Sequence, residues 1–414
     1  MKRRTFIVTA AVGLARVQQG PARAPQGEVP DAIKKLRPML DGVQPITAEE
    51  RQARIENACR LMAENRLSAI VMEGGSSMFY FSGTRLMAAD PPGVLVIPAK
   101  GALTWVVSGS NPRLSSISGG DLRTYTTENP YSVLAAALRD RGAGSGRIGV
   151  EERVRYGVFE GLRQAVPSIE YGSADPVTAG CRVIKSPAEL ALMQRANDIT
   201  LTCYRAVAET LREGMSTNEL RANISAGYRA MGVTGEALVS FGKYTAFPHG
   251  SIEEQRLHEG DMVLIDDGCS VEGYQSDITR TFVFGKPTGR QRFVWNTERK
   301  AQDAALAAAK PGATCESVDY AARQVITEAG FGPGYKLPGL PHRTGHGIGL
   351  DGHEWTYLVK GNKTKLQPGM CFSDEPNISI YGEFGVRLED CMHITEDGAR
   401  TFTKQSASID QPFG

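Results

Sequence analysis

Two aspartates, Asp266 and Asp277, lie eleven residues apart in the segment 262–284, and their spacing is the first indication of a functional site. Apolar runs, MVLI and ITRTFVF, flank a polar stretch at 268–273, a pattern typical of a β-hairpin. We expect the two carboxylates to lie opposite each other across the strands, and Asp267 to point to the other face. Like charges placed opposite in a sheet are destabilising. The pair therefore predicts a cation between them.

A second acidic pair and three histidines follow later in the chain. Glu375 and Glu389 are centred on Gly382, which predicts a second hairpin that carries two carboxylates. The histidines lie among glycines: His342, His346 and His353. Four carboxylates and one imidazole suit two divalent ions, such as Mn²⁺, Co²⁺ or Zn²⁺. A single aspartate at a strand end is more often a turn residue than a metal ligand. The prediction of a metal site therefore rests on the four carboxylates and the histidine taken together.

Composition and charge exclude several functional classes. The 414 residues are 41% hydrophobic and 22% charged, and the net charge is +1. Nucleic-acid and membrane-surface partners require a basic excess, so neither is expected. The seven cysteines form neither a CxxC motif nor a Cys/His cluster, which argues against a disulfide framework and a thiolate zinc site.

The first residues are typical of an export signal. Arg3 and Arg4 precede about ten mostly apolar residues, too few to span a bilayer. We expect a twin-arginine signal over residues 1–25 and a proline-rich linker over 26–46. This predicts a periplasmic or secreted protein without a membrane anchor in its mature form. The alternative is a cytoplasmic protein.

Residues 47–176 and 177–414 have different patterns. The first part alternates helices with strands at 68–72, 78–83, 93–99 and 103–108, which predicts an α/β domain. The second has a long helix at 187–212, a shorter one closing at Gly232, and then strands. The same order recurs, with helices at 290–310 and 314–330. We therefore predict an α+β domain with an internal duplication of about 98 residues and a site between its halves.

The motifs IDDG, SDITRT, HGIGLDGHE, EP and RLED together resemble those of the pita-bread metallopeptidases. This family includes methionine aminopeptidase, Xaa-Pro aminopeptidase, prolidase and creatinase. The resemblance is strong from Ile184 onward. It implies the pita-bread fold with an N-terminal creatinase-like domain. It also implies five metal ligands: Asp266, Asp277, His346, Glu375 and Glu389. This complete set differs from that of creatinase, which binds no metal.

The resemblance also implies roles for residues around the metal ions. Glu375 would accept a proton, and His353 would contact the substrate and its oxyanion. His249 resembles the histidine that contacts the residue after the cleaved bond. His342 resembles one found in the Xaa-Pro branch. Arg387, two residues before Glu389, shares its strand face and could bind a substrate carboxylate or act as a counter-ion.

The expected function is hydrolysis of the N-terminal Xaa-Pro bond of small peptides. A hydroxide shared by two divalent ions, most simply Mn²⁺, would attack the carbonyl carbon. Aminopeptidase and dipeptidase activities both remain open, and a homodimer is expected. The alternatives are a metal-dependent lyase or C–N hydrolase on the same scaffold, and an inactive binding module.

Overall fold

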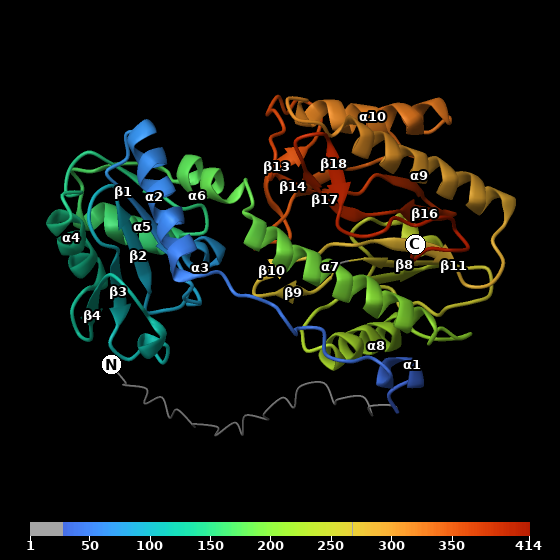
Figure 1. Cartoon of the computed structure of the whole chain (residues 1–414), viewed down its shortest axis with the longest axis horizontal. Coiled ribbons are helices and arrows are strands. Elements are labelled where there is room, and N and C mark those ends of the chain that lie inside the picture. The colour runs from blue at the N-terminus through green and yellow to red at the C-terminus, as the bar shows by residue number, and fades with distance from the viewer. Residues whose placement is uncertain (1–27, 267) are drawn as a thin grey trace, which may run out of the picture.

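The computed structural model describes residues 28–266 and 268–414, which form two domains lying side by side (Figure 1). The predicted leader at 1–25 and the predicted orientation of Asp267 lie outside the described residues. No helix in the described ranges is both long and apolar enough to cross a bilayer.

The N-terminal domain contains a six-stranded sheet in the order β4-β3-β2-β1-β5-β6. Its pairings are parallel except for β1–β2 and β2–β3. The strands are β1 (Ala69–Glu73), β2 (Val94–Pro98), β3 (Thr104–Ser108), β4 (Asp121–Tyr125), β5 (Arg147–Val150) and β6 (Glu170–Ser173). The helices are α2 (Ala48–Glu64), α3 (Ser76–Ser82), α4 (Pro130–Asp140), α5 (Tyr156–Ala165) and α6 (Asp175–Arg182).

Helices cover both faces of this sheet because its central strands are apolar on both sides. In β1, Val71 packs in one buried cluster with residues of α4 and α5. Its neighbours Ile70 and Met72 pack in another with residues of α2, α3 and α6. The alternation follows from the two-residue period of a strand. It confirms the predicted α/β layers.

One predicted strand is wrong. Residues 78–82 belong to α3, which begins after Gly75, and Gly83 follows the helix as its C-cap in a left-handed conformation, φ 72°. The aromatic residues of MFYFSG favour a strand by propensity. However, the buried positions are Ser77, Met78, Tyr80 and Phe81, and this spacing follows one face of a helix rather than the alternation of a strand.

The segment predicted as a linker contains structure of its own. It includes the short helix α1 (Asp31–Lys34), in which Ile33 is buried. The backbone N–H of Met39 donates to the carbonyl of Met231 over 3.1 Å. Figure 1 shows the blue chain passing from α1, beside α8, along the C-terminal domain and into the N-terminal domain. Residues 28–46 therefore pack against the C-terminal domain.

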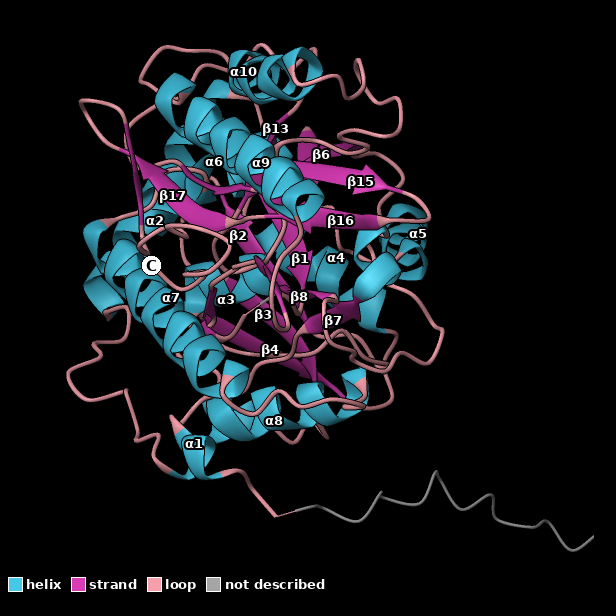
Figure 2. Ribbon diagram, turned by 90° about the vertical axis from the view of Figure 1, so that its right-hand side faces the viewer, coloured by secondary structure: helices cyan, strands magenta, loops and turns pink. Residues whose placement is uncertain are grey.

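Two pairs of helices surround the strands of the C-terminal domain (Figures 1 and 2). They are α7 (Pro187–Ala208), α8 (Thr217–Ala230), α9 (Gly289–Ala308) and α10 (Cys315–Glu328). α7 ends at Ala208, four residues before the predicted end at 212. Capping boxes begin both long helices, at Ser186 and at Thr288. The predicted repeat of two helices followed by strands is therefore present.

The strands of each half form separate small sheets. In the first half the order is β11-β8-β7, with a β9–β10 ribbon. These strands are β7 (Leu238–Phe241), β8 (Met262–Asp266), β9 (Ser270–Val271), β10 (Tyr274–Gln275) and β11 (Arg280–Val283). In the second half the order is β13-β12-β14-β17-β18, with a β15–β16 hairpin. These are β12 (Gly345–Gly347), β13 (Glu354–Leu358), β14 (Cys371–Asp374), β15 (Asn377–Ile380), β16 (Phe384–Arg387), β17 (Asp390–Ile394) and β18 (Ala399–Thr401).

The first hairpin forms, but the predicted pairing of Asp266 with Asp277 is wrong. Arg280 pairs with Ile265, and the same register continued by one residue places Asp266 opposite Thr279. The turn residues are Glu272 and Gly273, whose φ angles are 50° and 92°. Positive φ at both positions is typical of a two-residue type I′ turn. This turn places the centre of the hairpin one residue later than the midpoint between Asp266 and Asp277. Asp277 therefore lies two residues away from the position opposite Asp266.

The second hairpin has the predicted register. Asp374 pairs with Asp390 on one side, and Asn377 pairs with Arg387 on the other. The common register between these pairs places Glu375 opposite Glu389. The two glutamates are therefore symmetric about Gly382, as the sequence predicts.

Candidate active site

A cavity of about 790 Å³ is lined by residues from both halves of the C-terminal domain. It brings together all nine residues singled out from the sequence: His249, Asp266, Asp277, His342, His346, His353, Glu375, Arg387 and Glu389. The other lining residues, which no sequence motif marked, are Leu238, Pro248, Arg343, Gly352, Tyr357 and Val359.

The first half contributes two aspartates and a threonine. Asp266 ends β8, and Asp277 lies between β10 and β11. The Thr279 hydroxyl lies 2.7 Å from Oδ1 of Asp266 and 2.6 Å from Oε2 of Glu389. One O–H can donate to only one of these oxygens at a time. Thr279 thus links a carboxylate of the first half to one of the second. Thr279 is two residues after Asp277, and residues at this spacing in a strand share a face, so the sequence could have indicated that Thr279 lies in the site.

His346 on β12 is oriented by the backbone. Its Nδ1 lies 3.1 Å from the carbonyl oxygen of Gly347, which can only accept, so Nδ1 carries the proton. Nε2 then has a lone pair, 3.3 Å from Oε1 of Glu375 and 3.6 Å from Oδ2 of Asp277. Burial, and then the neighbouring His353, lower the pKa of His346 to about 3. The neutral ring therefore faces two carboxylates with an acceptor atom.

Ligand atoms of the five predicted metal residues come together in overlapping groups. Atoms of Asp266, Asp277 and Glu389 lie within 4.8 Å of one another, and so do those of His346, Glu375 and Glu389. Burial raises the pKa of Glu375 to about 7, and Asp266 adds to the effect. Burial, followed by Asp277 and Glu375, raises the pKa of Glu389 well above its ordinary value.

Arg387 on β16 is the buried cation of this cavity, with only 4% of its surface exposed. It forms an ion pair with Asp266. Its Nε donates to the Thr279 hydroxyl over 3.1 Å, and Nη1 donates to the Pro248 carbonyl over 3.2 Å. Burial alone would lower the pKa of Arg387, but the carboxylates, Asp266 foremost, raise it above the ordinary arginine value. The counter-ion role is thus present in the structure.

His342 and His353 differ in their surroundings. His342 Nδ1 lies 2.7 Å from the Arg343 carbonyl, and Nε2 is buried without a hydrogen-bond partner among the described residues. Burial, and then Arg387, lower the pKa of His342 to about 3. The His353 ring is more exposed and stacks on His346, with centroids 3.7 Å apart and an angle of 22°. Its Nδ1 lies 2.8 Å from Nη2 of Arg343.

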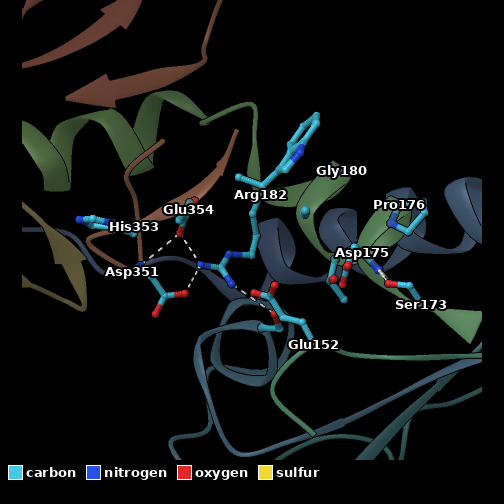
Figure 3. A pocket seen from close by; sticks show the side chains of 13 residues that line it. Glu152, Ser173, Asp175, Pro176, Gly180, Arg182, Asp351, His353 and Glu354 are labelled. Carbon is cyan, nitrogen blue, oxygen red and sulfur yellow. Dashed lines mark hydrogen bonds and ion pairs between the residues drawn. The ribbon is translucent and has the colours of Figure 1, made fainter. Parts of the chain in front are cut away.

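The segment that carries His353 is anchored at the domain interface. A second cavity, of about 480 Å³, adjoins this segment (Figure 3). There the buried guanidinium of Arg182 contacts Asp351 over 2.6 Å and also pairs with Glu354. Lys185 binds the other oxygen of Glu354 over 2.9 Å. These contacts on both sides of His353 tie it to the end of the N-terminal domain.

The donor set fits divalent cations. Four carboxylates converge in the cavity, while Arg387 is the buried cation among them and His346 is neutral. The acceptor atom Nε2 of His346 faces carboxylate oxygens, which are also acceptors, and a cation between them resolves this conflict. Carboxylate oxygens and one imidazole suit Mn²⁺, Co²⁺ or Zn²⁺. The residues that would hold the ions are those predicted from the sequence.

Comparison with known families agrees with this geometry. Residues 191–396 match the family described as Metallopeptidase family M24, and residues 54–184 match the Creatinase/Prolidase N-terminal domain. The chain is 30% identical over 360 residues to a Xaa-Pro dipeptidase of Pyrococcus furiosus, covering 86% of this chain and 99% of that protein. The chain belongs to metallopeptidase family M24.

Other family members have similar sequences and structures. A probable dipeptidase PepE of Mycobacterium tuberculosis is 33% identical, with 86% of this chain and 96% of that protein covered. The crystal structure of dipeptidase PepE from Mycobacterium ulcerans has a TM-score of 0.80 at 30% identity, covering 87% of this chain and 97% of that one. The pita-bread fold with an N-terminal creatinase-like domain, predicted from the motifs, is therefore confirmed. Membership in this metallopeptidase family also implies divalent metal ions.

Proposed function

We propose that this M24 protein is a dinuclear metallo-exopeptidase that hydrolyses the bond between an N-terminal residue and proline. The observation that carries the proposal is the convergence of four carboxylates and one neutral imidazole within two overlapping groups. Asp266, Asp277 and Glu389 would hold one ion, and His346, Glu375 and Glu389 the other. Bound divalent ions supply Lewis-acid activation of a water molecule.

The protein side chains provide the remaining chemistry. Glu375, whose Oε1 lies 3.3 Å from the Ser373 hydroxyl, accepts the proton of the attacking water. His353 donates a hydrogen bond to the oxyanion that develops on the substrate carbonyl. His249 and His342 both line the cavity and would contact the proline side of the cleaved bond. An Xaa-Pro bond has no N–H, so its recognition depends on shape and on contacts to the ring.

We further propose that the protein is a dipeptidase. The relatives named Xaa-Pro dipeptidase and dipeptidase PepE support this choice. A dipeptidase must recognise the free carboxylate of proline, and Arg387, which is already paired with Asp266, would add positive charge that attracts this group. An aminopeptidase would instead admit a chain beyond proline.

Three peptides test this proposal on the purified, manganese-loaded protein. Cleavage of Ala-Pro alone is the expected result. Cleavage of Ala-Pro-Ala as well would assign an aminopeptidase. Cleavage of Ala-Ala-Ala would remove the proline requirement. If none of the three peptides is cleaved, a metal-dependent lyase or C–N hydrolase on this scaffold becomes the better assignment.

Metal analysis separates the enzyme from a binding module that lacks catalytic metal. We expect about two ions per chain after loading and dialysis. An absence of bound metal would contradict the dinuclear mechanism. Titration with Mn²⁺, Co²⁺ and Zn²⁺ then identifies the ion that gives the highest activity.

We also propose that the chain is exported by the twin-arginine route and acts as a homodimer. The support for export is the Arg3-Arg4 pair before an apolar stretch. Replacing both arginines with lysine should keep the protein in the cytoplasm, as cell fractionation would measure. Light scattering of the purified protein measures its mass. For a homodimer we expect twice the mass of one chain, which is 44.7 kDa before any leader is removed.

A further inference from the structure

Arg343 lies on the wall of the metal-binding cavity, three residues before His346, and has no role in the function proposed above. Its Nη2 is 2.8 Å from Nδ1 of His353. Its guanidinium also lies over the ring of Tyr357, 4.4 Å from the centroid. A planar guanidinium stacked on an aromatic ring keeps few orientations, so Arg343 can direct its donor at one acceptor.

The contact determines which nitrogen of His353 carries the proton. Arginine is protonated at any pH at which proteins are folded, and it has donors but no acceptor. Nδ1 of His353 must therefore accept from Arg343. In the neutral ring, the hydrogen is then on Nε2.

Nε2 of His353 has no hydrogen-bond partner among the described residues, whereas Nδ1 is engaged. The ring is exposed, lines the cavity and is stacked on the buried ring of His346. Water alone would leave both tautomers of such a ring accessible. Arg343 selects the tautomer with a donor at Nε2, and the stack on His346 fixes the plane in which this donor lies.

We propose that Arg343 is a positioning residue that holds His353 in the Nε2–H tautomer, so that this N–H can donate to the carbonyl oxygen of the substrate. The inference rests on the proposed peptidase function. A donor fixed before the reaction stabilises the developing oxyanion without reorganisation. The residue thus acts through His353 and needs no contact with the substrate.

Kinetics of Arg343→Met and Arg343→Lys on Ala-Pro test the inference. We expect Arg343→Met to lower kcat by about 10–100-fold with little change in KM, the usual cost of losing a residue that orients a catalytic group. Arg343→Lys keeps a charged donor and should recover much of kcat. Arg85→Met is the matched control, since Arg85 also stacks on a ring, that of Phe79 at 3.7 Å, but lines a different groove.

A double-mutant cycle shows whether Arg343 acts through His353. His353→Ala should lower kcat, and adding Arg343→Met should cause no further loss, because coupled residues are not additive. Full additivity of the two losses would overturn the inference. A rise in KM at unchanged kcat in Arg343→Met would overturn it too, by assigning Arg343 to substrate binding.

A spectroscopic measurement tests the tautomer without an assay. The chain has six histidines, so ¹⁵N-labelled histidine gives few signals in zinc-loaded protein, and His353→Ala identifies the one of interest. We expect a protonated Nε2 and an unprotonated Nδ1 in the wild type, and mixed tautomers in Arg343→Met. A protonated Nδ1 in the wild type would overturn the inference. Thermal unfolding and metal content of each variant establish that it is folded and loaded.

These results separate two failures. A wild-type protein that cleaves none of the peptides contradicts the proposed function, whatever the spectra give. An active wild type with an equally active Arg343→Met contradicts only the role of Arg343.

Discussion

The two acidic hairpins of the C-terminal domain carry their carboxylates in different registers. In the second half, Glu375 lies opposite Glu389, midway between the pairs Asp374–Asp390 and Asn377–Arg387. In the first half, Asp266 lies opposite Thr279, and Asp277 is two residues further along. Each hairpin nevertheless supplies two carboxylates, the candidate metal ligands, to one cavity.

A hairpin can therefore shift its carboxylates by two residues and still direct them into the cavity, whereas a shift of one residue would turn them away. Side chains alternate between the faces of a strand, so a shift by two returns to the same face. The position opposite Asp266 is filled by a hydroxyl, 2.7 Å from its carboxylate. The first half thus avoids a directly opposed pair of like charges and gains a hydrogen bond.

The largest expected effect comes from removing one ligand of each hairpin. Asp277→Ala and Glu389→Ala should each lower kcat/KM by about a thousandfold or more, since a catalytic metal contributes several kcal/mol. Circular dichroism should remain that of a folded protein, while metal per chain falls. If Asp277→Ala keeps full activity, the register offset has removed Asp277 from the metal site and the comparison fails.

A smaller effect is expected at Thr279, which lies opposite Asp266 in the first hairpin. Thr279→Val removes the hydroxyl between Asp266 and Glu389 at nearly constant volume. We expect metal affinity to fall by about 10–100-fold, as is usual for groups that orient ligands. Isothermal titration with Mn²⁺ measures this, and Thr279→Ser, which keeps the hydroxyl, should bind like the wild type. Equal affinities in all three proteins would show that the hydroxyl is not needed.

The long helices α7 and α9 offer a third test of the duplication. Aligning their capping residues, Ser186 and Thr288, places buried Glu298 of α9 at the position of buried Ala196 in α7. Burial raises the pKa of Glu298 well above its ordinary value of 4.5. Its carboxyl thus stays protonated in the fold at a pH where the unfolded chain ionises, and stability is lost as pH rises above that value.

Glu298→Gln removes this titration, so the variant should unfold a few degrees higher than the wild type near pH 8, by roughly 2–4 °C. The difference should shrink toward pH 4, where both states of the wild type are protonated. Calorimetry at several pH values measures it. A stabilisation that does not depend on pH would contradict the assignment to Glu298 ionisation.

The smallest effect is expected at the turn that sets the first register. Glu272 has φ 50°, a conformation that costs most residues stability and that asparagine tolerates better. Glu272→Asn should raise the unfolding temperature by roughly 1–2 °C and leave activity unchanged. Glu272→Val should lower it, because a β-branched residue is strained at positive φ. If Glu272→Asn lowers the unfolding temperature, the positive φ at this turn is not a source of strain in the hairpin.

Much of the site could be predicted because its residues occur in short motifs. All nine predicted residues line one cavity, and the Glu375–Glu389 register follows from their symmetry about Gly382. The first register could not be derived in the same way, because it depends on which two residues of the polar stretch take positive φ. The prediction of a strand at 78–83 was wrong because it followed the strand propensity of the aromatic residues. In the structure, Gly75 and Gly83 flank a helix at this place.

The sequence alone determined the ligand types, the duplication and the family, since motif spacing and capping residues are local properties of the chain. The groups that surround each candidate ligand follow from the packing of the folded chain. Thr279 meets Glu389 only when segments 110 residues apart pack together, and Arg343 meets His353 only when the chain between them folds back on itself. The function of a hydrogen-bond donor depends on which acceptor lies within about 3 Å of it, and folding sets the distance between donor and acceptor.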